Sequence, residues 1–462
     1  MTASRGRVRA GRRPDRLLEP WSAPFALING AAVGLVPILL PIDAARYGVG
    51  HVGLVMGAFN LGALAAPAVG VLADRYRAYR TLAATCAAVS AVSLWLFPLA
   101  APPLQLLLGL ANGAAFAGAV TVANLLIVER RPRAEWNQRL GWLETVLSVG
   151  QGGALVLAAW LSGLSARNGL LIAAVVPAAA IPLSLLLIPR MPGTAGAIRP
   201  ETGTPGGRDE GPSADRPAEG AQAGHRLASV GHVGEWGPAS PSRVHHPHPR
   251  SLAGLKRSAG LLRGPFGWLL AAWIPAYAGA AIIFALYPVL FSRAFGVRPQ
   301  ASAVAFAVVV FLSLPLFLLA SRVCQRRGPA ATIAGALAAR VVLLAALAAL
   351  AAVGHVPAVL PLAAFGGIMF AWSFLSVASP GLTGQLVPSS AEGDAQGALN
   401  AASGLAGLLG SVVGGLAADL WGYPAALSIG AGAVLLGVAI LVVTKPWARD
   451  RAASPVPAAD TV

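Results

Sequence analysis

Long apolar stretches dominate the chain, and short polar connections separate them. An α-helix rises about 1.5 Å per residue, so about 20 apolar residues cross a hydrocarbon core about 30 Å thick. Each stretch therefore predicts one transmembrane helix. We predict spans at 24–42, 49–73, 81–100, 103–128, 139–163, 168–188, 265–291, 300–320, 329–352, 357–387, 396–419 and 424–444.

Polar segments divide these spans into two sets of six. We predict a basic tail over 1–20, a six-helix bundle over 21–189, a linker over 190–262, a second six-helix bundle over 263–445 and a tail over 446–462. The linker is rich in Pro, Gly, Ser and His, so it cannot build a core and is expected to be disordered. The fold class is all-α integral membrane, with about twelve transmembrane helices in two pseudo-symmetric bundles.

Composition places the chain in lipid, because 56% of its residues are hydrophobic and only 11% are charged. A soluble globular chain carries about 25% charged residues. The net charge of +16 comes from arginines in the connections between spans, and not from a face that could bind nucleic acid. Basic loops face the cytoplasm. We therefore predict a multi-pass protein of the cell membrane with both termini and the linker cytoplasmic.

The connection after the second span carries the most informative motif. It reads Gly70-Val-Leu72-Ala-Asp74-Arg75-Tyr-Arg77-Ala-Tyr-Arg80. Leu319-Ala-Ser-Arg322 stands at the end of the eighth span, as Leu72-Ala-Asp-Arg75 does at the end of the second. The two halves are therefore repeats of one another, and repeats of this kind place the substrate site near the midplane between them.

This motif resembles the signature of the major facilitator superfamily between its second and third helices, Gly-x-Leu-Ala-Asp-Arg-x-Gly-Arg-Arg/Lys. Arg77 stands where the signature has its second glycine, and the basic pair is displaced. The resemblance covers nearly all of the chain outside the linker and the tails. It implies alternating access, in which the motif ties the halves together when the protein opens outward. The conformational gate that it implies consists of Gly70, Asp74, Arg75, Arg77 and Arg80.

Drug-efflux members of the superfamily are the subgroup that the chain resembles, with two departures. Their proton-coupled members carry an arginine in the fourth helix, where Gly109-Leu-Ala-Asn112-Gly113 has glycine. Gly150-Gln151-Gly152-Gly153 is similar to the antiporter signature of the fifth helix but lacks its proline.

Glu144 is the acidic residue that lies well inside a predicted span. It belongs to a polar stripe in the fifth span with Ser148 and Gln151, at helical spacing. Burial favours the neutral form of a carboxyl group, so Glu144 can gain and lose a proton, as proton coupling requires. The alternative is a structural ion pair with an arginine such as Arg139.

Aromatic and neutral polar residues recur on the predicted spans of both halves. Aromatic walls with few fixed charges suit a bulky, partly apolar ligand, although the same spacing also serves helix packing. The candidate substrate cavity comprises Asn29, Asn112, Gln151, Trp273, Tyr277, Phe284, Trp372, Ser376 and Asn400. Arg340, in the ninth span, is expected to form an ion pair or to extend toward the interface.

The function that these features favour is proton-coupled export of a small amphipathic compound. Uptake of a neutral metabolite remains open, as does a non-transporting membrane sensor. No nucleophile–base or metal constellation points to an enzyme. We expect no cofactor and no metal, since His245-His246-Pro-His248 lies in the linker without other ligands at metal-binding spacing. The expected partners are a small-molecule substrate, protons and the bilayer, and the protein is expected to be a monomer.

Overall fold

The computed structural model describes residues 19–131, 136–190, 260–388 and 391–448. Within this part the chain forms helices and short turns, with no β-strand. Twelve of its helical segments are long and apolar enough to cross a membrane, which confirms the predicted fold class. The predicted linker and both predicted tails lie almost entirely outside the described residues.

The six spans of the N-terminal half begin at Pro20 and end at Leu187. Several of them are divided into shorter helices. The elements are η1 (Pro20–Ser22), α1 (Ala23–Gly30), η2 (Ala31–Leu35), α2 (Val36–Ala44), η3 (Ala45–Tyr47), α3 (Val49–Gly62), η4 (Ala63–Ala65), α4 (Ala66–Tyr76), α5 (Tyr79–Leu96), η5 (Phe97–Leu99), α6 (Pro102–Arg130), α7 (Trp136–Leu161), α8 (Ala166–Ala173) and α9 (Val175–Leu187).

Each span of the C-terminal half is one continuous helix. These helices are α11 (Pro265–Phe295), α12 (Pro299–Arg327), α13 (Pro329–Val353), α14 (Val359–Leu386), α15 (Glu392–Trp421) and α16 (Tyr423–Thr444). Five of them have proline in the first turn, where its missing N–H has no helical partner to lose.

Proline accounts for one of the breaks in the N-terminal half. Pro37 has no N–H, so the carbonyl of Val33 loses its α-helical donor, and η2 is a π-helical segment at this point. Gln151 of α7 donates its Nε2–H to that carbonyl at 3.3 Å. A side chain of the fifth span thus compensates the break in the first.

Exposed aromatic side chains mark both ends of the spans. We call the end that carries the motif at residues 70–80 the signature end, and the opposite end the far end. Tyr76 and Trp268 are exposed at the signature end, and Tyr47, Trp95, Trp160 and Trp421 at the far end. Tyrosine and tryptophan gather where a membrane meets water, so the two sets are consistent with a bilayer between them.

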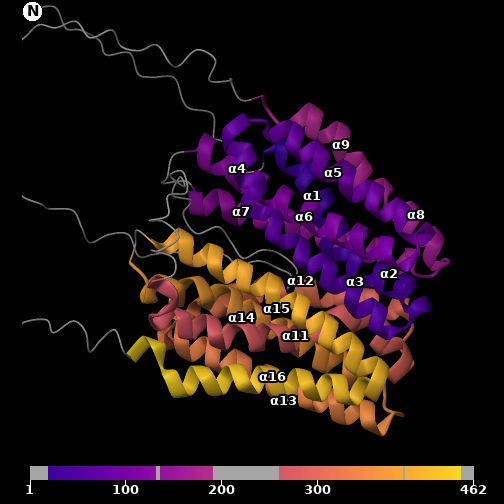
Figure 1. Cartoon of the computed structure of the whole chain (residues 1–462), viewed down its shortest axis with the longest axis vertical. Coiled ribbons are helices and arrows are strands. Elements are labelled where there is room, and N and C mark those ends of the chain that lie inside the picture. Colours follow the sequence, from indigo (N-terminus) through magenta and orange to yellow (C-terminus); the bar gives the residue numbers. More distant parts are fainter. Residues whose placement is uncertain (1–18, 132–135, 191–259, 389–390, 449–462) are drawn as a thin grey trace, which may run out of the picture.

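Figure 1 shows the two halves as two bundles, the first in indigo to magenta and the second in orange to yellow. α3 packs along α15, α7 along α12, and α2 along α11. The contacts extend from the far end, where a Cβ on Gly50 would lie 3.4 Å from Asp419 Oδ2, to mid-span, where Gly404 faces Asn60. At the signature end, α4 packs on α5 and α6 of its own half. The halves are thus joined from the far end to the middle.

Candidate functional site

Three aromatic side chains of the candidate cavity lie in contact within the C-terminal bundle. Trp273 and Tyr277 of α11 have ring centroids 6.2 Å apart, and Tyr277 meets Trp372 of α14 edge-on at 6.0 Å. The indole N–H of Trp273 donates to the Ser403 hydroxyl of α15 at 2.8 Å. We call Trp273, Tyr277 and Trp372 the aromatic cluster. It presents flat apolar rings beside neutral hydrogen-bonding groups.

Arg340 of α13 lies on the other side of this cluster. Its side chain is 1% exposed, and its guanidinium carbon is 5.6 Å from the centroid of the Trp372 ring. The expected extension toward the interface is therefore wrong, because the side chain turns into the bundle. A cation over an indole face is attracted by the ring quadrupole, by about 2 kcal/mol when both groups are desolvated.

Phe284 belongs to a different aromatic group from the other predicted cavity residues of α11. Its ring packs against Phe365 at 5.8 Å, and Phe365 in turn stacks on Tyr287 at 4.0 Å. Phe284 is two helical turns from Tyr277, which is about 10 Å along the axis. This group fills the bundle nearer the far end.

Ser376 lies one helical turn from Trp372 of the aromatic cluster, and Asn400 lies one turn from Ser403, which binds that cluster. Ser376 follows Trp372 on α14 and donates to the carbonyl of Ser373 at 3.2 Å. Asn400 precedes Ser403 on α15, and its Oδ1 accepts from Gln396 at 3.5 Å. Neutral amide and hydroxyl groups therefore stand on two helices beside the aromatic rings.

The predicted polar residues of the first and fifth spans lie in the seam between α1 and α7. Asn29 donates to the carbonyl of Leu147 at 2.9 Å. One helical turn further along both segments, Gln151 donates to the carbonyl of Val33. Glu144 is 6% exposed on the same helix, α7. Gly30 and Gly150 allow the two backbones to touch, since a Cβ on Gly30 would lie 2.6 Å from the Gly150 carbonyl oxygen.

Asn112 is placed differently. It is fully buried on α6, and neither its Oδ1 nor its Nδ2 has a hydrogen-bond partner within the described part of the chain. A buried amide without partners is costly, about 1–3 kcal/mol per group, so this position is a candidate for a bound water or a substrate group.

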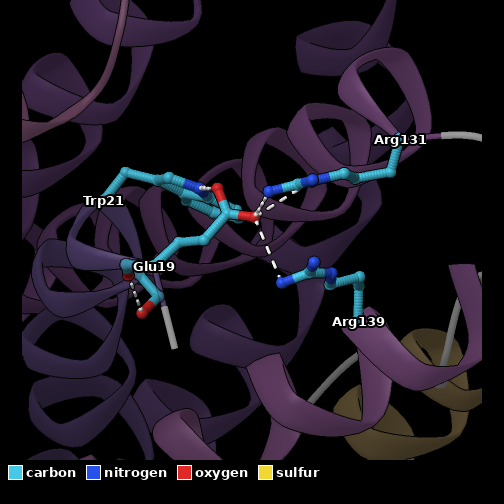
Figure 2. Close-up of polar contacts among 5 residues, drawn as sticks. Glu19, Trp21, Arg131 and Arg139 are labelled. Carbon is cyan, nitrogen blue, oxygen red and sulfur yellow. Dashed lines mark hydrogen bonds and ion pairs between the residues drawn. The ribbon is translucent and has the colours of Figure 1, made fainter. Parts of the chain in front are cut away.

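A cluster of ion pairs that the sequence pattern did not indicate lies at the signature end (Figure 2). The carboxylate of Glu19, just before the first span, accepts two hydrogen bonds from Arg131 at 3.1 and 2.6 Å. Arg139 of α7 approaches the same oxygen to 3.6 Å, and the Trp21 indole N–H donates to the second oxygen. One carboxylate thus connects the starts of the first and fifth spans to the end of the fourth. The one indication of these ion pairs in the sequence was that Glu19 is an acidic residue next to an arginine-rich segment.

The signature turn connects α4 to α5. Arg77 has φ 47° and ψ 29°, which is the left-handed conformation, and its N–H donates to the carbonyl of Ala73 at 2.8 Å. This conformation costs a residue other than glycine about 1–2 kcal/mol. The turn therefore forms although Arg77 replaces the glycine of the signature.

The remaining gate residues surround this turn. Gly70 faces α6, where a Cβ would meet Thr121 at 3.5 Å, and Arg75 lies 5.6 Å from the Tyr76 ring. Asp74 is in the last turn of α4, but its side chain lies outside what the structure describes. Arg80 is half-buried at the start of α5.

A second polar network, also absent from the sequence predictions, lies buried at the far end. Gln105 donates through Nε2 to Asp43 Oδ2 and to the Phe97 carbonyl, both at 3.1 Å. Its Oε1 lies 2.8 Å from His51 Nε2, which must therefore be the donor. Arg46 pairs with Asp43 at 3.4 Å. The network joins the ends of the first and third spans to the starts of the second and fourth.

Twelve helical segments long and apolar enough to cross a membrane, in two bundles joined along paired helices, are the architecture of a multi-pass membrane protein. The chain belongs to the Major Facilitator Superfamily, whose family model matches residues 23–379 and 269–460. Members of this family move small molecules across a bilayer, so the chain is a transporter and not an enzyme.

Solved structures with the same fold include the nucleoside transporter NupG, at 14% identity and a TM-score of 0.68, covering 92% of this chain and 98% of that one. A point mutant of NupG gives a TM-score of 0.69 with the same identity and coverage. A bacterial homologue of the human lysosomal transporter Spinster, inward-facing and occupied, is 15% identical with a TM-score of 0.63, covering 96% of this chain and 100% of that one. No curated protein matches the chain.

Proposed function

We propose that this transporter exports small amphipathic compounds across the cytoplasmic membrane in exchange for protons, by alternating access of its two halves. The observation that carries the proposal is the aromatic cluster. Trp273, Tyr277 and Trp372 form continuous contacts from α11 to α14, and Ser403 adds a hydroxyl group. Flat rings beside neutral polar groups favour a ligand that is largely apolar and carries a few hydrogen-bonding groups.

Glu144 is the residue that we propose for proton coupling. It is 6% exposed and lies on α7, the helix that packs on α1 of its own half and on α12 of the other. A change of charge at this position alters the cost of burying α7, because a desolvated carboxylate is far more expensive than a neutral carboxyl group. Protonation can therefore bias the movement between the halves.

The arginine distribution supports an orientation in which the signature end, both termini and the 190–262 linker are cytoplasmic. With that orientation the far end is external and is closed by the contacts of α3 with α15 and of Arg293 with the Ala45 carbonyl at 3.3 Å. In alternating access, a conformation closed at its external end is one that exchanges substrate with the cytoplasm. An exporter must pass through such a state.

Reporter fusions test this orientation. Fusions at Arg46, Ala101 and Arg167 are expected to read external, and fusions at Arg77, Arg131 and Gly220 internal. A reversed pattern at any two sites would overturn the orientation, and with it the direction of loading.

Uptake of a neutral metabolite is the second candidate. The amides of Asn112 and Asn400 favour it, since they can bind hydroxyl and amide groups without a charged partner. Export and uptake differ in the direction of net movement, which one assay can separate.

The experiment uses everted membrane vesicles that contain the full chain, energised to an acidic interior, with ethidium and Nile red as probes. Export predicts accumulation of a probe inside the vesicles and its release when a protonophore collapses the gradient. Accumulation that persists without a proton gradient would remove proton coupling. Failure of every amphipathic probe, together with uptake of a neutral metabolite by intact cells, would favour the second candidate.

A further inference from the structure

The signature turn holds a strained residue where the related motif has glycine. Two residues other than glycine have positive φ in the described part of the chain, Arg77 at 47° and Lys445 at 38°. Lys445 follows the last span. Arg77 lies between two spans, so the strain must be offset by contacts on both sides of the turn.

Buried anchors stand on each side of Arg77. Before it, Ala73 is fully buried, and its carbonyl accepts the Arg77 N–H. After it, Tyr79 is 1% exposed, and its hydroxyl donates to Glu129 Oε1 at the end of α6. The next helix starts immediately, with the N–H of Leu82 donating to the Ala78 carbonyl at 2.8 Å. Arg77 is therefore held, within the seven residues from Ala73 to Tyr79, by one backbone hydrogen bond before it and one side-chain hydrogen bond after it.

Glu129 occupies an unfavourable place for a carboxylate. It is next to last in α6, and the C-terminal end of a helix carries partial negative charge that repels an acid. Its acceptance of the Tyr79 hydroxyl offsets this repulsion. Arg131, two residues further, binds Glu19 before the first span, so the end of α6 is fixed from both sides.

We propose that Tyr79 and Glu129 are positioning residues that hold Arg77, and with it the signature turn, in the left-handed conformation. The pair compensates for Arg77 at this position. The order of the turn consequently depends on a side-chain hydrogen bond. The inference concerns the shape of the turn, and it holds for either direction of transport and with or without proton coupling.

Hydrogen exchange of the purified full chain in lipid nanodiscs tests the proposal, read by mass spectrometry on peptides that cover residues 70–85. Tyr79→Phe keeps the buried ring and removes only the hydroxyl, so the fold is retained. Loss of a hydrogen bond to a charged group predicts about tenfold lower protection of the turn amides. Tyr76→Phe is the matched control, because Tyr76 is 63% exposed in the same turn of chain, and its protection is expected to be unchanged.

The decisive measurement is the double variant. Arg77→Gly relieves the backbone strain, so in that background Tyr79→Phe is expected to change protection by less than about twofold relative to Arg77→Gly alone. Glu129→Leu is expected to reproduce Tyr79→Phe and to add nothing to it, whereas Glu129→Gln keeps an oxygen acceptor and retains part of the protection.

Additive effects of Arg77→Gly and Tyr79→Phe would overturn the proposal, since a purely structural tyrosine loses the same protection in either background. It would also be overturned if Tyr79→Phe behaved like Tyr76→Phe. Neither result depends on transport. A negative result in hydrogen exchange would therefore leave the proposed function untouched, because the vesicle assay tests that function separately.

Discussion

Asn60 of α3 donates a hydrogen bond to the hydroxyl of Ser411 of α15, across 351 residues of sequence, at 3.2 Å. Its Nδ2 also donates to the carbonyl of Met56 in its own helix at 3.0 Å. This bond stands within a seam of small residues. A Cβ on Gly53 would lie 2.4 Å from the Ser411 carbonyl oxygen. The two halves therefore meet backbone to backbone.

Gly53→Leu is expected to prevent closure of the far end, because the added side chain occupies the space of the α15 backbone. Spin labels at Leu164→Cys and Val353→Cys, both exposed at the far end, measure the separation of the halves in a Cys324→Ser background. The distance distribution should move to longer values. Gly335→Leu is the control, since nothing lies within 4 Å of its Cβ position. An unchanged distribution for Gly53→Leu would show that the seam is not the closing contact.

Asp74→Asn is expected to slow transport several-fold and leave equilibrium binding of substrate nearly intact. The resemblance to the signature implies that this acid ties the halves together at the signature end when the protein opens outward. Its loss changes the balance between conformations and not the binding groups. Rates and affinities in proteoliposomes separate the two effects, and a large loss of affinity with normal turnover would contradict the assignment.

Glu144→Gln should abolish movement of substrate against its gradient and still allow downhill exchange. Glutamine resembles the protonated carboxyl group but cannot release a proton, so the cycle loses its coupling step. The measurement is accumulation in proteoliposomes with and without an imposed pH gradient. Asp394→Asn, an exposed acid at the start of α15, is the control. If the Gln variant still concentrates substrate, Glu144 is structural.

Trp372→Leu is expected to weaken binding of a transported amphipathic probe at least tenfold, because we propose that the aromatic cluster binds substrate and a central tryptophan supplies a large share of binding energy. Trp372 contacts both Tyr277 and Arg340, so its removal opens the aromatic cluster. Fluorescence titration of Nile red provides the measurement. Trp421→Leu, at an exposed far-end position, should bind as the original chain does. Equal loss in both variants would point to a general effect of tryptophan removal.

Gln105→Leu should destabilise the far end of the N-terminal bundle by about 2–3 kcal/mol, since Asp43 loses a buried donor and His51 its acceptor. The thermal unfolding midpoint of the purified chain is expected to fall by several degrees. Gln325→Leu, on the exposed end of α12, should leave the midpoint unchanged. If Gln105→Leu unfolds at the same midpoint as the original chain, water replaces the side-chain amide of Gln105 at no cost in stability.

The apolar pattern by itself determined the number and approximate positions of the spans. A bilayer imposes one length on every crossing helix, and that length is visible in the sequence as runs of apolar residues. The family was also evident from Gly70, Leu72 and Asp74, because a motif between two spans depends on local order alone. The candidate residues of the aromatic cluster followed from helical spacing.

Tertiary structure alone decided which polar groups meet. Gln105 interacts with Asp43 and His51, which precede it by 62 and 54 residues, and Arg131 meets Glu19 across 112. No local periodicity relates such pairs, because contacts between helices depend on how the spans pack.

Arg77 shows the same division within one turn. The sequence determined that Arg77 stands where the signature has its second glycine. The turn forms nevertheless, and only the tertiary structure shows that Tyr79 and Glu129, on neighbouring helices, make the hydrogen bond that we propose offsets the local backbone cost.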